Sequence, residues 1–140
     1  MGKGKVFIDT GAFYALIDRD DPYHVVAYKQ WAELLEQKFL LYITNYIVSE
    51  TYTLLRYRLG WDVACKFLQV LEECSSLGRI TIKTVPLATE QYARNLLLSL
   101  AEKDLSYIDA ISLATIKMEE IPLAFSFDNH FQLAKAKVIP

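Results

Sequence analysis

Long apolar runs and cysteines are both scarce in this chain, and each scarcity excludes a class of protein. No apolar run among the 140 residues approaches the length that spans a bilayer, and Met1–Lys5 reaches Asp9 too soon for a signal peptide. Cys65 and Cys74 are the only cysteines, and they lie in one predicted helix about 13 Å apart along its axis, too far for a disulfide. We therefore expect a cytoplasmic protein with reduced thiols and no membrane contact.

Two kinds of catalytic machinery are also missing. The chain has no Gly-rich loop with a lysine that would hold nucleotide phosphates. Its two histidines, His24 and His130, do not form a nucleophile triad with a serine and an acid, and imidazole is a rare ligand in oxygen-rich Mg²⁺ sites. The formal net charge of −2 indicates no general affinity for nucleic acid, but it leaves room for local basic patches.

Apolar residues make up 53% of the chain, and they are distributed as in one folded domain over residues 1–140. Continuous apolar runs predict buried strands at 6–8, 39–43 and 123–127. The alternating stretch 80–85 predicts a half-exposed strand near a sheet edge, and 138–139 predicts a last edge strand. Helices are predicted over 12–17, 22–38, 45–59, 61–75, 89–103 and 110–119, with a short one after 129. This alternation predicts an α/β fold, a parallel sheet with helices on both faces.

Local signals suggest where several helices begin and end. Asp21-Pro22 has the form of a helix start after the polar break that begins at Asp18. Gly60 suits a left-handed cap at the end of the helix over 45–59. Ser106 and Asp109 have the spacing of a capping box.

Four acidic residues are predicted to meet at one edge of this sheet. Asp9 directly follows the first strand, and Asp128 directly follows the strand over 123–127. The carboxyl ends of parallel strands share one edge, where ligands bind in open α/β sheets. Glu50 and Asp109 lie in or near the first turns of helices that begin at the same edge, so all four acids should converge.

Each acid also has a structural explanation of its own. Asp9 could cap the helix that follows it, as Asp109 could cap its own helix with Ser106. Glu50 could pair with Arg56 or Arg58. Because these explanations would have to hold independently of one another, we favour a common site.

Clustered carboxylates repel one another unless they are protonated or bridged by cations. All-oxygen ligation suits hard ions, so the cluster predicts a site for Mg²⁺ or Mn²⁺.

These residues resemble the PIN domain family, and in particular VapC-type toxins of toxin–antitoxin pairs. The resemblance rests on Asp9-Thr10, on Glu50 in an amphipathic helix, on Leu105-Ser106-x-x-Asp109-Ala110 and on Phe125-Ser126-Phe127-Asp128-x-x-Phe131. It covers essentially the whole chain and implies a three-layer α/β/α sandwich with a central, mainly parallel sheet of four to five strands. It also implies a metal-dependent endoribonuclease with an acidic site of Asp9, Glu50, Asp109 and Asp128. Thr10, Ser106 and Ser126 match small hydroxyl positions that would orient the carboxylates.

The implied reaction is hydrolysis of RNA phosphodiester bonds with one or two Mg²⁺ ions. Asp9 and Asp109 are the first choices for direct ligation. Asp128 would ligate the ion or hold a metal-bound water, and Glu50 would ligate a second ion or orient the water. Candidates for phosphate contact, with a solvated helix face as the alternative, are Arg56, Arg58 and Lys66.

The expected partners are the RNA substrate, a second copy of the chain and an antitoxin protein. The homodimer and an antitoxin groove are expected because two central helices carry more aromatic residues than a small core readily absorbs: Tyr46, Tyr52, Tyr57, Trp61 and Phe67. Two alternatives remain open: a PIN-domain nuclease of RNA maturation, and a non-catalytic PIN-like interaction module.

Overall fold

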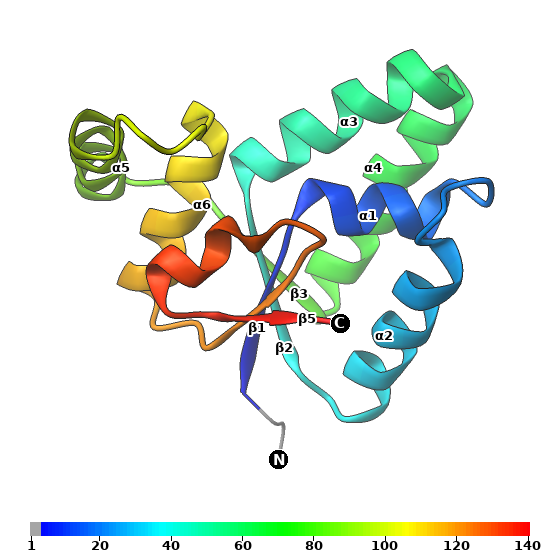
Figure 1. Ribbon diagram of the computed structural model, residues 1–140. Coiled ribbons are helices and arrows are strands. Elements are labelled where there is room, and N and C mark those ends of the chain that lie inside the picture. Colours follow the sequence, from blue (N-terminus) through cyan, green and yellow to red (C-terminus); the bar gives the residue numbers. More distant parts are fainter. Residues whose placement is uncertain (1–3) are drawn as a thin grey trace.

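A five-stranded parallel sheet forms the centre of the protein (Figure 1), which the computed structural model describes over residues 4–140. The strand order is β3-β2-β1-β4-β5. The strands are β1 (Lys5–Ile8), β2 (Leu40–Thr44), β3 (Ile80–Lys83), β4 (Leu123–Phe125) and β5 (Lys137–Ile139). β1 has a strand neighbour on either side, and helices cover both faces of the sheet, which explains why its apolar run Val6–Ile8 is continuous and fully buried. The predictions of a parallel sheet and of both edge strands are confirmed.

Helices cover both faces of the sheet. They are α1 (Thr10–Ile17), α2 (His24–Glu36), α3 (Asn45–Leu59), α4 (Trp61–Ser76), α5 (Leu87–Ser99), α6 (Tyr107–Met118) and the short 3₁₀ helix η1 (Asn129–Ala134). Figure 1 shows α1, α2 and α4 on one side of the strands and α5 and α6 on the other. Within residues 4–140, no helix is both long and apolar enough to cross a membrane. Both cysteines lie on α4 as free thiols, as predicted.

The polar break before α2 folds differently from the prediction. Two carboxylates close turns: Asp18 Oδ1 accepts from the backbone N–H of Asp20 at 3.0 Å, and Asp21 Oδ1 accepts from that of Tyr23 at 2.8 Å. Helix α2 therefore begins at His24, two residues after the proline. Because Asp18 and Asp21 form these turns, their presence in the loop has a structural explanation.

Two other helix ends differ from expectation. α5 begins directly after Pro86, whose carbonyl accepts the N–H groups of Thr89 and Glu90, and it ends at Ser99 rather than at residue 103. Gly60 has positive φ (99°) as predicted, but its ψ of 171° is extended rather than left-handed helical. This conformation is nearly restricted to glycine, and it lets α4 start immediately after α3 ends.

Candidate active site

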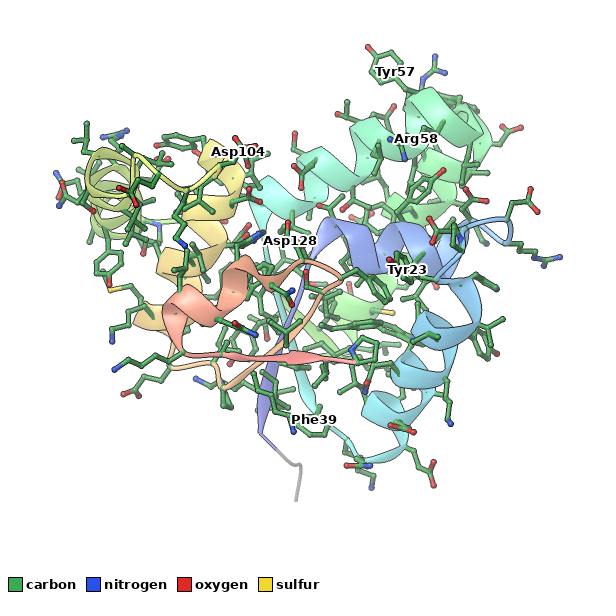
Figure 2. The ribbon with its side chains drawn as sticks, viewed as in Figure 1. Tyr23, Phe39, Tyr57, Arg58, Asp104 and Asp128 are labelled. Carbon is green, nitrogen blue, oxygen red and sulfur yellow. The ribbon has the colours of Figure 1, made fainter. Side chains whose placement is uncertain are left out.

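The carboxyl edge of the sheet brings the four acidic residues to one end of the molecule. Asp9 follows β1, Asp128 lies three residues beyond β4, Glu50 lies in the second turn of α3 after β2, and Asp109 lies in the first turn of α6. Figure 2 labels Asp128 at this end, with Phe39 at the opposite end, where β2 begins. The topology therefore places these acids as the strand pattern predicts.

Asp9 occupies the N-cap position of α1, but its side chain does not cap the helix. Its carboxylate accepts a hydrogen bond from Ser126 Oγ, with Oδ2 and Oγ 3.0 Å apart. Its backbone N–H donates to the carbonyl of Phe125 at 3.1 Å and extends the pairing of β1 with β4. The capping explanation is therefore wrong for Asp9.

The environment of Asp9 disfavours its charge. Burial is the largest cause and raises the pKa of the carboxyl from 3.8 to about 6, with a smaller contribution from the negative charge of Glu50. The hydrogen bond from Ser126, the proximity of His130 and the backbone of Thr10 act in the opposite direction. A carboxyl perturbed in this way, at a ligand-binding edge, is typical of a functional site.

Asp109 and Asp128 approach each other across the imidazole ring of His130. Nδ1 of His130 lies 2.9 Å from Asp128 Oδ1, and Nε2 lies 3.6 Å from Asp109 Oδ1. The side chain of His130 is only 10% exposed, and its Nε2 is buried without a hydrogen-bond partner. The sequence analysis assigned His130 no role at the site. The sequence signal for such a role is its position two residues after Asp128.

Two of the acids also have structural roles, of which the sequence analysis predicted the capping box of Asp109. Ser106 and Asp109 form a complete capping box at the start of α6, with both hydrogen bonds 3.0 Å long. Asp128 caps η1, because its Oδ1 accepts from the backbone N–H of His130 at 3.1 Å. Capping uses these carboxylates without removing them from the site.

The predicted hydroxyl positions differ in what they contact. Ser126 bonds Asp9 and also accepts from the backbone N–H of Asp128 at 3.0 Å. Thr10 is buried and accepts from the hydroxyl of Thr51 at 3.2 Å. Ser106 acts through the capping box.

Glu50 is half-buried and forms no ion pair with Arg56 or Arg58 in the part of the chain that the structure describes. The guanidinium of Arg58 instead lies over the ring of Tyr14, 5.2 Å from its centroid. Lys66 lies away from the acids, on α4 beside an apolar groove. A phosphate-binding role for these basic residues stays a prediction.

The donor chemistry of the site fits a hard cation, while its side chains do not form a closed ligand set. Between residues 4 and 140, no three His, Cys, Asp or Glu side chains are arranged to hold a metal ion. Asp9, Asp109 and Asp128 each turn toward a hydrogen-bond donor or the His130 ring. The four carboxylates nevertheless supply the oxygen donors that a hard divalent cation takes, while the unpartnered Nε2 of His130 faces Asp109.

A polar cleft of about 430 Å³ opens beside the acids. Asp128 and His130 line it, together with Gln132 from η1 and Lys103 from the loop before α6. Figure 2 shows the neighbouring Asp104 at the same end of the molecule as Asp128. Of the four acids, Asp128 lines this cleft, which carries the positive charge of Lys103 beside the carboxylate of Asp104.

A parallel α/β sandwich with acids at its carboxyl edge is the architecture of a PIN nuclease domain. The sequence matches the PIN domain model over residues 6–137, and the chain belongs to the PIN domain family. It is homologous to VapC-type ribonucleases, as two curated relatives show. The 23S rRNA-specific endonuclease VapC20 of Mycobacterium tuberculosis is 30% identical over 92% of this chain and 93% of that protein. A VapC ribonuclease of Archaeoglobus fulgidus is 34% identical over 90% of this chain and 78% of that protein.

Solved structures agree with this assignment. The crystal structure of M. tuberculosis VapC20, described as a sarcin–ricin loop cleaving toxin, matches with a TM-score of 0.82 and 28% identity over 97% of this chain and all of that one. FitAcB of Neisseria gonorrhoeae matches with a TM-score of 0.61 and 19% identity over 96% of each chain, which shows the shared fold alone.

Because the folded pKa of Asp9 is raised, replacing it by Asn should change how stability depends on pH. Between about pH 4 and pH 6 the Asp9 carboxyl binds more protons in the native protein than in the unfolded chain, so its contribution to stability falls as pH rises through this window. The loss is on the order of 2 kcal/mol and is absent in Asp9→Asn. Chemical denaturation of both proteins in EDTA from pH 4 to pH 8 measures it. We expect Asp9→Asn to be the more stable at pH 7, and a constant difference across this range would contradict the raised pKa.

Proposed function

We propose that the protein is a metal-dependent endoribonuclease and the toxin of a toxin–antitoxin pair. The observation that carries the proposal is the convergence of Asp9, Glu50, Asp109 and Asp128 on the carboxyl edge of the sheet. Homology to VapC ribonucleases over nearly the whole chain supports it. RNA is the substrate class, and 23S rRNA is the first candidate because VapC20 is specific for it. The activity would be cytoplasmic, where this RNA is found.

Mg²⁺ or Mn²⁺ is the proposed cofactor, with Asp9, Asp109, Asp128 and Glu50 as its ligand set. A bound divalent ion lowers the pKa of water and stabilises negative charge on phosphate oxygens. Ser126 would orient the Asp9 carboxylate through its hydrogen bond, and Thr10 and Ser106 would support the first turns of α1 and α6. His130 would hold Asp128 and Asp109 near each other.

The proposal predicts that Asp109→Asn and Glu50→Gln lose RNA cleavage by about two orders of magnitude or more, because several kcal/mol of transition-state stabilisation are removed. Purified proteins are incubated with 23S rRNA and a total transcript pool, with Mg²⁺, with Mn²⁺ and with EDTA. The matched control is Glu36→Gln, an exposed acid at the end of α2, near the start of β2.

Three outcomes separate the candidate functions. Metal-dependent cleavage lost in the two site variants supports the nuclease. Cleavage confined to precursor RNAs favours an enzyme of RNA maturation. Absence of cleavage with either metal favours the non-catalytic interaction module.

The toxin assignment makes a separate prediction about growth. Expression of the wild-type chain alone should arrest bacterial growth, and Asp109→Asn at equal soluble level should not. Growth should recover when the cognate antitoxin is expressed with the wild-type chain. Normal growth at confirmed soluble expression would contradict the toxin role and leave the nuclease proposal intact.

An apolar groove of about 640 Å³ between α1, α2 and α4 is the surface that we propose for the antitoxin. Phe13, Trp31 and Phe67 line it, and its charged residues are Lys66, Arg79 and Asp62, two positive and one negative. An apolar segment with acidic neighbours fits this lining. The groove shares only Phe67 with the aromatic surface expected on α3 and α4. Tyr46, another member of that surface, donates a hydrogen bond to Glu90.

The proposed homodimer rests on the junction of α3 and α4. Tyr57 is 84% exposed and Trp61 is 58% exposed, so they form the part of the expected aromatic surface that remains open. We expect light scattering to give a dimer at micromolar concentration and Tyr57→Glu/Trp61→Glu to give a monomer, because two buried carboxylates would oppose association. A wild-type monomer at high micromolar concentration, with and without Mg²⁺, would refute the dimer.

A further inference from the structure

An aromatic ring lies open to solvent beside the acidic site. Tyr23 belongs to the loop between α1 and α2, and its ring stacks on Phe127, with centroids 4.4 Å apart and an interplanar angle of 12°. Tyr23 is nevertheless 53% exposed. Because Phe127 covers one face of the ring, much of the exposed area belongs to the opposite face and the edges. The pair therefore presents a flat aromatic surface.

Contacts beneath the ring and within its own loop fix the position of Tyr23. Beneath it, Phe127 packs edge-on against the buried ring of Phe125 at 6.3 Å. In its own loop, the N–H of Tyr23 donates to Asp21, and a ring nitrogen of His24 lies 2.8 Å from the carbonyl oxygen of Ala15. A ligand that stacks on a fixed ring orders few additional side-chain torsions, which lowers the entropic cost of binding.

The position of the pair connects it to the site. Phe127 lies between Ser126, which bonds Asp9, and Asp128, which contacts His130. In Figure 2 Asp128 lies near the centre of the view and Tyr23 to its right, by the start of α2, and both lie above Phe39. A chain that binds at the acids and extends past Phe127 would meet the Tyr23 ring.

We propose that Tyr23, supported by Phe127, is a stacking platform for an unpaired nucleobase next to the bond that is cleaved. The proposal rests on the proposed function, since it assigns a binding site to the same RNA substrate. Aromatic rings bind unpaired bases by stacking and tolerate any sequence, because every base has a π face. The loop carries three acids, Asp18, Asp20 and Asp21, against one arginine, Arg19, and this net negative charge favours a base rather than a phosphate group as the occupant of the ring face.

The test compares a ring with an apolar side chain that cannot stack. Binding of a fluorescein-labelled oligoadenylate and of an abasic ribose-phosphate oligomer of equal length is measured by anisotropy. All proteins carry Asp109→Asn to keep the oligomers intact. We expect Tyr23→Leu to reduce the preference for the oligoadenylate over the abasic oligomer by about ten-fold. Tyr23→Phe should keep that preference, because the ring remains.

The controls distinguish this role from others. An equal preference for the oligoadenylate over the abasic oligomer, with Tyr23 and with Tyr23→Leu, would overturn the proposal. An equal loss of affinity for both oligomers would also overturn it, because it indicates a structural role. Melting curves verify that the variants are folded. Cleavage of 23S rRNA by the wild-type chain is measured in parallel. If it cleaves while the preference is unchanged in Tyr23→Leu, only the platform fails; if it cleaves nothing, the proposed function fails as well.

Discussion

The hydroxyl of Ser126 is the contact on which the geometry of the site depends. It donates to the carboxylate of Asp9 and accepts from the backbone N–H of Asp128, both at 3.0 Å. The Ser126 side chain thus links the residue that follows β1 to the loop that follows β4. Pairing of Ile8 with Phe125 brings the two strand ends together, and Ser126 then fixes the loop that carries Asp128 and Phe127.

The same region is electrostatically costly. Asp9 is placed where burial opposes its charge, close to Glu50, while Asp109 and Asp128 flank an imidazole with one unpartnered nitrogen. A protein selected for stability alone would use apolar residues here. Retaining such groups is typical of functional sites, where stability is given up for chemistry or binding. Strand β1, whose apolar side chains Val6–Ile8 are fully buried, gives these charged groups a rigid support.

Much of this fold was predictable. The apolar periodicities of helices and strands indicate the elements, and their alternation along the chain indicates a parallel sheet. Val6-Phe7-Ile8 reads as a central strand, and the alternating run from Ile80 reads as an edge strand, from apolar pattern alone. Parallel pairing then places Asp9 and Asp128 at one edge without further information. What could not be predicted is where side chains point within loops. The contact of His130 with Asp109 joins two elements 21 residues apart, and the stacking of Tyr23 on Phe127 joins segments 104 residues apart. The local signal at Asp21-Pro22 misled for a similar reason, since the Asp21 carboxylate was used for a turn rather than for the helix.

The order in which the acids occur along the chain has a consequence for a cell that makes such a protein. Asp9 meets Ser126 only when residues 117 positions apart in sequence come together, and Ser126 in turn donates its N–H to the carbonyl of Ile139 on β5. An unfinished chain that ends before β4 carries three of the acids but neither Ser126 nor His130. Sites built from such distant segments form late, when the whole sheet has paired. A growing polypeptide would thus lack the assembled site until the segment from β4 to β5 has been synthesised and folded.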